Sequence, residues 1–506
     1  MTSRTGISVN IDCNVFFITH SKAAMNARTV DDYARLFHGT DVDEVLWNPN
    51  AKTTAYAGKV FSPFWEGYDP EGGPEQPFVM KYHRPHQRDM FHRYVSAALA
   101  LHRQGIDPFE RWLRVTREGG IKAWLTMRMN DDHGSTNHEC PSHGRFWHAH
   151  PEFRRAMYRA QGRGTHVFDY AHPEVRGYHL ALVRELLERY DLDGLELDWM
   201  RHEHYFQPGH EAAGVPLLND FMRQAQALVR EAEQRRGHPI ALGVRAATTY
   251  RAALGLGTDP VQWAKEGLID RLIVTPYWET CDADIPLEEW RILLAGTQVA
   301  LGATIEANLR PHRGAAQRRN SLETVRGLAA SYLHRGAERI YFFNYFPAYP
   351  KKSAIVMDSS WHRRAFTEAS SLEALQGKPR RHIVTFRDVA APGAPTAFAL
   401  PCPCGPGLPV EFRLHTGPRP TTTHAAVILS FADPGGMGAG DWVRLNGAPC
   451  QAMGAVKPAD PEPCDHPFAF AIPLEALQDG YNLIEAQTLN RRDITWAEIR
   501  FDNPDK

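Results

Sequence analysis

Up to residue 376 the chain alternates between short apolar runs and segments whose apolar residues recur at helical spacing. Strands that alternate with helices indicate parallel βαβ units. Eight of them predict a (β/α)8 barrel, the α/β TIM-barrel fold, with insertions. An open doubly wound sheet would also alternate, but no G-x-G-x-x-G phosphate cradle follows any run. The eight runs are 7–17, 42–48, 121–130, 193–199, 240–246, 271–278, 299–309 and 339–346.

Two of the helical segments carry clear end signals. Segment 172–190 has Pro173 in its first turn and places Val175, Leu182 and Leu186 on one face. A second helix is predicted from about Pro216 to Arg236 and stops at Gly237, a residue typical of helix C-termini. The run at 193–199 directly follows the first of these helices, as a strand of a βαβ unit should.

From residue 377 the pattern changes to short alternating segments separated by Pro and Gly turns, with no convincing helix. This pattern predicts a C-terminal all-β sandwich, jelly-roll-like, over 377–506, after a barrel domain over 1–376. The segments are 381–389, 399–403, 410–416, 425–431, 441–447, 468–474, 481–487 and 493–501.

Two acidic residues stand at the ends of predicted barrel strands. In the fourth run Leu195 and Leu197 face the helices, so Glu196 and Asp198 face inward. In the seventh run Glu306 shares the inward side with small residues. Inward carboxylates at the C-terminal ends of barrel strands lie where such barrels carry out chemistry.

A pair of carboxylates on facing strand ends is what glycosidic bond cleavage requires. One protonates the leaving oxygen, and the other attacks the anomeric carbon or activates water. We therefore predict Asp198 and Glu306 as the catalytic residues, with Asp198 as the nucleophile and Glu306 as acid/base. Glu196 is the reserve candidate. The structural alternative for either acid is a salt bridge with Arg245 or Arg310.

Polar and aromatic residues at or just past the strand ends are predicted to contact a sugar. Polar groups can hydrogen-bond sugar hydroxyls, and flat rings can stack on pyranose faces; loop caps and core packing are the respective alternatives. The predicted substrate-binding residues are Trp47, Arg128, Asn130, His133, Glu196, Trp199, Arg201, Arg245, Tyr277, Trp278, Asn344 and Tyr345, with His202, His204, Tyr205 and Tyr349 on the same rim.

The long connection 129–171 is rich in histidine, which suggests a metal site. Its spacing matches no standard zinc signature, because it has neither His-Glu-x-x-His nor paired Cys-x2-Cys. We therefore predict no metal and no cofactor; a metal-dependent hydrolase that uses this loop remains an alternative. The residues concerned are His133, His138, Glu139, Cys140, His143, His148 and His150.

The composition limits the classes of binding partner that the sequence favours. Lys plus Arg number 57 against 59 for Asp plus Glu, so nucleic acid and anionic membrane surfaces are poor candidates. The seven cysteines are scattered, and reduced thiols in a cytoplasm are expected. We expect no secretory signal and no membrane span, although a processed secreted protein would present the same N-terminus.

Two spans carry a family resemblance. HPEVRGYHLALVRELLERYDLDGLELDWMRHEHYF (172–206), preceded by IKAWLTMRMNDDHG (121–134), resembles the bacterial family-10-like glycosyl-hydrolase-like proteins. The resemblance implies a (β/α)8 hydrolase that acts on carbohydrate. The phrase DGYNLIEAQTLNRRDITWAEIRF (479–501) resembles the closing strands of the galactose-binding-like jelly rolls that accompany many glycoside hydrolases.

The leading functional hypothesis is therefore a glycoside hydrolase acting on an oligo- or polysaccharide. A non-catalytic carbohydrate-binding protein on a degenerate barrel is the rival, in which the acids would pair with arginines while the aromatic rim persists.

Overall fold

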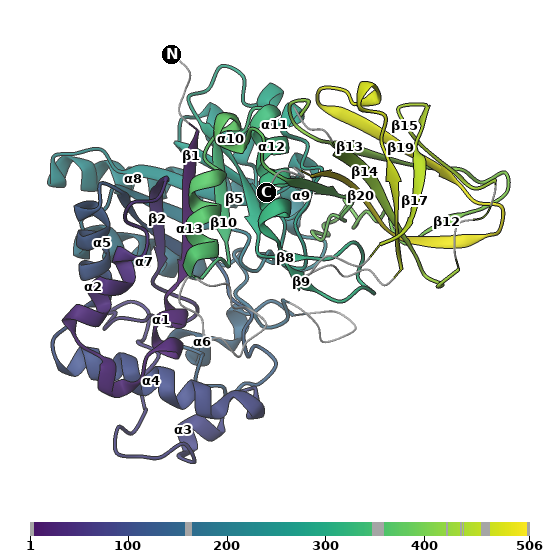
Figure 1. Cartoon of the computed structure of the whole chain (residues 1–506). Coiled ribbons are helices and arrows are strands. Elements are labelled where there is room, and N and C mark those ends of the chain that lie inside the picture. Colours follow the sequence, from purple (N-terminus) through teal and green to yellow (C-terminus); the bar gives the residue numbers. More distant parts are fainter. Residues whose placement is uncertain are drawn as a thin grey trace.

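The computed structural model describes residues 5–156, 164–346, 359–420, 424–435, 438, 440–456 and 466–502. A closed barrel of eight parallel strands forms its centre, in the order β1-β10-β7-β6-β5-β4-β3-β2 (Figure 1). This arrangement confirms the predicted (β/α)8 fold. The barrel strands are β1 Gly6–Asp12, β2 Val42–Asn48, β3 Lys122–Arg128, β4 Gly194–Asp198, β5 Ala241–Ala247, β6 Arg271–Thr275, β7 Ala300–Glu306 and β10 Arg339–Phe343.

Helices cover the outside of the barrel and fill the long connections (Figure 1). The longest, α8, starts at Glu211, five residues before the predicted start, so Pro216 lies inside it. In the described part of the chain no helix is long and apolar enough to cross a membrane. The helices are α1 Cys13–Thr19, α2 Ala27–Arg35, α3 Pro77–Met80, α4 Arg88–Arg103, α5 Pro108–Glu118, α6 Arg145–Ala149, α7 Pro173–Arg189, α8 Glu211–Arg236, α9 Tyr250–Gly255, α10 Pro260–Lys265, α11 Leu287–Leu293, α12 Leu322–His334, α13 Ser359–Glu368 and α14 Leu372–Leu375.

The first predicted run, 7–17, is not one strand. β1 ends at Asp12, and Cys13 begins α1, which buries Phe16 and Phe17. Asp12 caps this helix, because its carboxylate accepts a hydrogen bond of 3.0 Å from the backbone N–H of Asn14. A short buried helix and a buried strand are equally apolar, so the run alone did not separate them.

Side chains inside and outside the barrel separate as the strand alternation predicts. Leu195, Leu197 and Leu301 belong to the core between strands and helices. The barrel interior holds a smaller cluster that includes Trp124 and Tyr341. Trp124 lies against Gly194, where an added Cβ would come within 2.4 Å of the indole. The barrel is therefore a filled core up to the level of its mouth.

The C-terminal residues form two antiparallel sheets beside the barrel, as the predicted sandwich requires (Figure 1). One has the order β11-β20-β14-β18-β17, with β12 also paired to β20, and the other has the order β13-β19-β15-β16. The sequence missed β16 and β17. The strands are β11 Arg380–Ile383, β12 Cys402–Cys404, β13 Val410–His415, β14 His424–Phe431, β15 Trp442–Leu445, β16 Ala448–Pro449, β17 Gln451–Ala455, β18 Pro467–Ala471, β19 Tyr481–Gln487 and β20 Arg492–Asp502.

Many contacts join these sheets to the barrel, among them the ion pair of Arg413 with Asp284 and the two described next. Gly327 of α12 faces β11 so closely that an added Cβ would lie 2.0 Å from the carbonyl oxygen of Arg381. Further along, the Asp388 carboxylate accepts hydrogen bonds of 2.7 to 2.9 Å from the backbone N–H groups of Tyr277, Trp278 and Glu279. The chain after β11 thereby holds the loop after β6. The domain boundary at residue 377 stays a prediction.

Candidate active site at the barrel mouth

A cavity of about 1580 Å³ opens at the carboxyl ends of the barrel strands. Residues that end or follow six of these strands line it, including Asp12 at the end of β1, Asn50 after β2, His133 after β3, Arg201 after β4, Trp278 after β6 and Asn344 after β10. The hairpin of β8 (Asn308–Leu309) and β9 (Arg318–Arg319) contributes a further wall. The lining mixes charged, amide and aromatic side chains.

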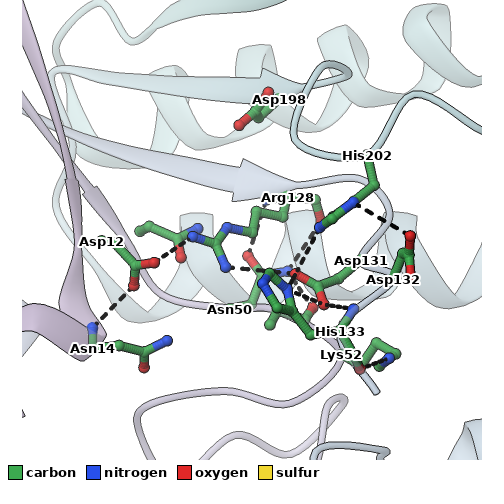
Figure 2. A network of polar contacts seen from close by, with 12 residues as sticks. Asp12, Asn14, Asn50, Lys52, Arg128, Asp131, Asp132, His133, Asp198 and His202 are labelled. Carbon is green, nitrogen blue, oxygen red and sulfur yellow. Dashed lines mark hydrogen bonds and ion pairs between the residues drawn. The ribbon is translucent and has the colours of Figure 1, made fainter. Parts of the chain in front are cut away.

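Arg128, at the end of β3, organises one side of the cavity. Its guanidinium donates to the Asp12 carboxylate at 2.7 Å and lies 3.5 Å from that of Asp131 (Figure 2). Burial alone would raise the pKa of Asp12, but the charges of Arg128 and Arg201 outweigh it and lower that pKa. Asp12 is therefore an ionised carboxylate at the cavity surface.

Asp131, His133 and His202 form a second group beside the first (Figure 2). The His133 Nδ1 lies 3.0 Å from one Asp131 oxygen, and the His202 Nε2 lies 3.9 Å from the other. His202 Nδ1 and the Tyr277 hydroxyl are 2.7 Å apart. Although burial opposes it, the pKa of Asp131 is held well below its usual range by His133, His202 and Lys52.

Asp198, the predicted nucleophile, does not line this cavity. Its side chain is 2% exposed and accepts a hydrogen bond of 2.6 Å from Arg245, whose other nitrogen donates to Thr275. Arg245 lies 3.9 Å from the centre of the Phe343 ring. In Figure 2 Asp198 stands apart from the network around Arg128. The salt bridge with Arg245 that the sequence allowed is present.

Glu306, the predicted acid/base, also lies below the cavity surface. Its carboxylate accepts hydrogen bonds of 3.0 and 3.1 Å from the Asn344 amide, which does line the cavity. Burial raises the pKa of Glu306 to about 7, despite the lowering influence of Asn344 and Arg319. Glu306 is thus linked to the cavity through Asn344, and a substantial fraction of its carboxyl groups is protonated near neutral pH.

Glu196 lies one layer deeper on β4. Its carboxylate accepts hydrogen bonds of 2.7 Å from the Thr126 and Tyr341 hydroxyls. Burial raises its pKa to about 7, although Arg245 lowers it. Glu196 is buried and does not line the cavity at the barrel mouth, so the structure does not place it with the predicted substrate-binding residues that reach this cavity.

The remaining predicted contacts divide into two sets. Trp47 stacks on Trp112 in the outer core, and Trp199 packs against Tyr170 and Phe221, so the structure places both rings away from the rim. Their strand positions turn outward to the helices. Asn130 and Tyr345 are also buried; Asn130 donates to two loop carbonyls, and Tyr345 stacks on a neighbouring ring. The predicted residues that line the cavity are Arg128, His133, Arg201, His202, Tyr277, Trp278 and Asn344. Tyr349 lies outside the described residues.

The histidine-rich connection does not converge on one point. His143 stacks on Trp147 with ring centres 3.7 Å apart and hydrogen-bonds backbone carbonyls. His150 pairs with Glu152. Among the described residues, only Asp131, His133 and His202 meet as a possible metal-binding group.

Several cavity residues escaped the sequence prediction. Asp12 was missed because the first strand was predicted to continue to residue 17. In the structure this strand ends at Asp12, which caps helix α1. Asn50 lies in the long connection after β2 and accepts a hydrogen bond from the backbone N–H of Arg128. His202 was predicted on the rim and does line the cavity, but its approach to Asp131 across two loops was not predicted, because no local spacing encodes it.

Comparisons with known proteins found matches of low similarity among solved structures. No protein-family model and no curated protein sequence matches the chain. Among solved structures, a Paenibacillus cycloisomaltooligosaccharide glucanotransferase is 8% identical, with a TM-score of 0.34, over 98% of this chain and 58% of the other. An Anoxybacillus α-amylase is 12% identical (TM-score 0.40) over 97% and 100% of the two chains. The PgaB (BpsB) glycoside hydrolase domain of Bordetella bronchiseptica is 10% identical (TM-score 0.42) over 72% and 99%. None of these similarities identifies a reaction.

Proposed function

We propose that this chain is a glycoside hydrolase that cleaves glycosidic bonds of an oligo- or polysaccharide at the barrel mouth. The observation that carries the proposal is the cavity itself. Its volume of about 1580 Å³ exceeds the roughly 300–1,000 Å³ of most small-ligand sites, so a substrate of more than one ring fits. We also propose that the barrel is related to the family-10-like glycosyl-hydrolase-like proteins. The C-terminal sheets are proposed to be a galactose-binding-like domain.

The lining suits a polyhydroxylated substrate. Arg128 and His133, at and after the end of β3, and Asn344, after β10, offer hydrogen-bond donors from two strand ends. Trp278, which is 39% exposed, offers a flat ring for stacking on a sugar face. An apolar ligand would leave these donors unpaired, which disfavours its binding.

For the proton transfer we propose Glu306. A general acid works best when its pKa lies near the operating pH, and burial raises the pKa of Glu306 to about 7. Asn344 holds this carboxyl group and lines the cavity. Rotation of the Asn344 side chain away from Glu306 on substrate binding would open the protonated carboxyl group to the cavity, where it could give its proton to the glycosidic oxygen.

For the second carboxylate we propose Asp198, which Arg245 would have to release in part when substrate binds. Asp12 competes for this role because it lines the cavity directly as an ionised carboxylate. The two acids end strands β4 and β1, so they would approach a substrate from different sides. Separate variants distinguish them.

The test begins with a glycan library and analysis of the products. On a substrate so identified, Glu306→Gln should lower kcat about 10²–10⁴-fold, and Asp198→Asn should abolish turnover while glycan binding remains. Glu196→Gln is the matched control, since it removes a buried carboxyl of similar pKa that does not line the cavity at the barrel mouth. Circular dichroism first establishes that each variant is folded.

The outcomes separate the alternatives. Loss of turnover in Asp12→Asn with retained turnover in Asp198→Asn assigns the second carboxylate to Asp12. An equal loss in Glu196→Gln and Glu306→Gln would contradict a chemical role for Glu306. Glycan binding without products from any substrate would identify a carbohydrate-binding protein and overturn the proposal.

A further inference from the structure

The group of Asp131, His133 and His202 has features that hydrogen bonding does not explain. His202 is 8% exposed, and its Nε2 has no hydrogen-bond partner in the described part of the chain. This atom faces Asp131, whose nearest oxygen is 3.9 Å away, too far for a hydrogen bond. A buried nitrogen that has no hydrogen-bond partner and lies opposite a buried carboxylate indicates that a water molecule or an ion binds between them.

The spacing of the three side chains fits a metal ion. One ligand atom from each of them lies within 4.8 Å of the other two. Nitrogen and oxygen ligands at about 2.0–2.2 Å from one ion lie roughly 3–4 Å apart, so a small inward shift completes the set. Two imidazoles and one carboxylate are a ligand set of first-row divalent metals with open positions.

Neighbouring residues support the two imidazoles as ligands. A metal-bound histidine usually passes its other ring proton to a fixed acceptor. The His202 Nδ1 lies 2.7 Å from the Tyr277 hydroxyl, which can accept a hydrogen bond from it and leave Nε2 free to bind. The backbone N–H of His133 donates to Asp131 at 2.9 Å, which fixes the carboxylate beside its own ring.

We propose that Asp131, His133 and His202 bind one divalent first-row metal ion, of which Zn²⁺ is the test case. All three side chains line the cavity, so the open coordination positions face the space where a substrate would lie. A bound ion could there take water or the hydroxyl oxygens of a polyol as further ligands. The site comes from the loops after β3 and β4 and uses one histidine of the histidine-rich connection.

The local charge sets the expected affinity. The carboxylates of Asp12, Asp131 and Asp132 face Arg128, Arg201 and Lys52, and the Arg128 guanidinium lies 3.5 Å from Asp131. The positive and negative charges of the cluster therefore balance before a metal binds. The three cationic side chains repel an incoming metal ion. We expect binding in the micromolar range and a preference for an anionic additional ligand, such as hydroxide or a carboxylate.

The test uses the full chain without a histidine tag, dialysed against a chelator and then against metal-free buffer. Titration calorimetry with Zn²⁺ should give one ion per chain, and Co²⁺ should produce visible d–d absorption with the same stoichiometry. Both readouts are independent of turnover, so they remain valid if the proposed hydrolase activity fails.

Variants assign the ligands. His133→Ala and His202→Ala should each weaken Zn²⁺ binding more than about 100-fold, and Tyr277→Phe about 10–100-fold. His148→Ala is the matched control, because it removes an exposed histidine of the same connection whose ring packs against His143 and Trp147, and it should leave the affinity unchanged. His133 is partly exposed, so its variant keeps the fold even if the His202 variant does not.

Two results would overturn the proposal. One is the absence of a stoichiometric heat or Co²⁺ absorption at metal concentrations up to about 1 mM, well above the micromolar affinity expected from the balanced charges. The other is an equal loss of binding in His148→Ala and His133→Ala.

Discussion

The barrel mouth contains two sets of acids that differ in their surroundings. The mouth acids, Asp12 and Asp131, line the cavity, and neighbouring cations lower the pKa of both. The interior acids, Glu196, Asp198 and Glu306, are buried below it, and burial raises the pKa of Glu196 and Glu306 to about 7. Asp12 and Asp198 both end a strand, yet their side chains are 20% and 2% exposed. Facing inward at a strand end therefore does not by itself bring a carboxylate to the substrate.

The largest change in the free energy of unfolding is expected when the ion pair of Asp198 and Arg245, in the interior set, is broken. Arg245→Met leaves Asp198 as an uncompensated charge in the barrel and should lower the free energy of unfolding by about 3–5 kcal/mol, measured by urea denaturation. The double variant with Asp198→Asn removes both charges and should recover most of this loss. If the single and double variants unfold alike, the pair does not compensate a buried charge.

The interior acids should also control how stability depends on pH. Glu306 has a pKa of about 7 in the folded protein against 4.5 ordinarily, so the native state binds more protons between these values. The free energy of unfolding should therefore fall as pH rises from 4.5 to 7. Glu306→Gln cannot titrate and should be more stable than the parent at pH 8 by on the order of 3 kcal/mol. Denaturation at four pH values measures this, and parallel pH profiles would contradict it.

Breaking the ion pair at the mouth should cost less. Asp12→Asn weakens the contact with Arg128, but Asp131 remains 3.5 Å from the guanidinium and solvent reaches the site. We expect a loss of about 1–2 kcal/mol in the free energy of unfolding. A loss as large as that of Arg245→Met would erase the distinction between the two sets.

The smallest effect on stability is expected at the cavity rim. Trp278→Ala removes a ring that is 39% exposed and should change the free energy of unfolding by no more than about 0.5 kcal/mol. Glycan affinity should nevertheless fall about tenfold, because a stacking contact is worth about 1 kcal/mol. Calorimetry with a bound glycan measures this, and an unchanged affinity would remove Trp278 from the binding surface.

The sequence predicted the barrel well because strand alternation is a local signal. β2 was placed from Val42 to Asn48, and Leu195 and Leu197 turned to the helices as expected. Depth within the barrel is not local. Glu196 and Asp198 face inward, but whether an inward side chain is packed or lines a cavity depends on Tyr341 and Arg245, which come from other strands.

The site was predicted less well than the fold for the same reason. Trp47 and Trp199 sit near strand ends, but their strand positions turn outward, so their rings pack among the helices. Asp131 and His202 meet only because the loops after β3 and β4 lie side by side. Such a meeting depends on the folded arrangement and leaves no spacing in the chain to detect.

The Asp388 carboxylate bears on how the barrel and the C-terminal sheets evolved. It receives three consecutive amide hydrogens from the loop that carries Tyr277 and Trp278, more than a hundred residues earlier in the chain. A barrel recombined with a foreign C-terminal module would leave those amides without an acceptor and the loop without its anchor. The mouth and its C-terminal neighbour are therefore expected to be inherited as one unit rather than shuffled.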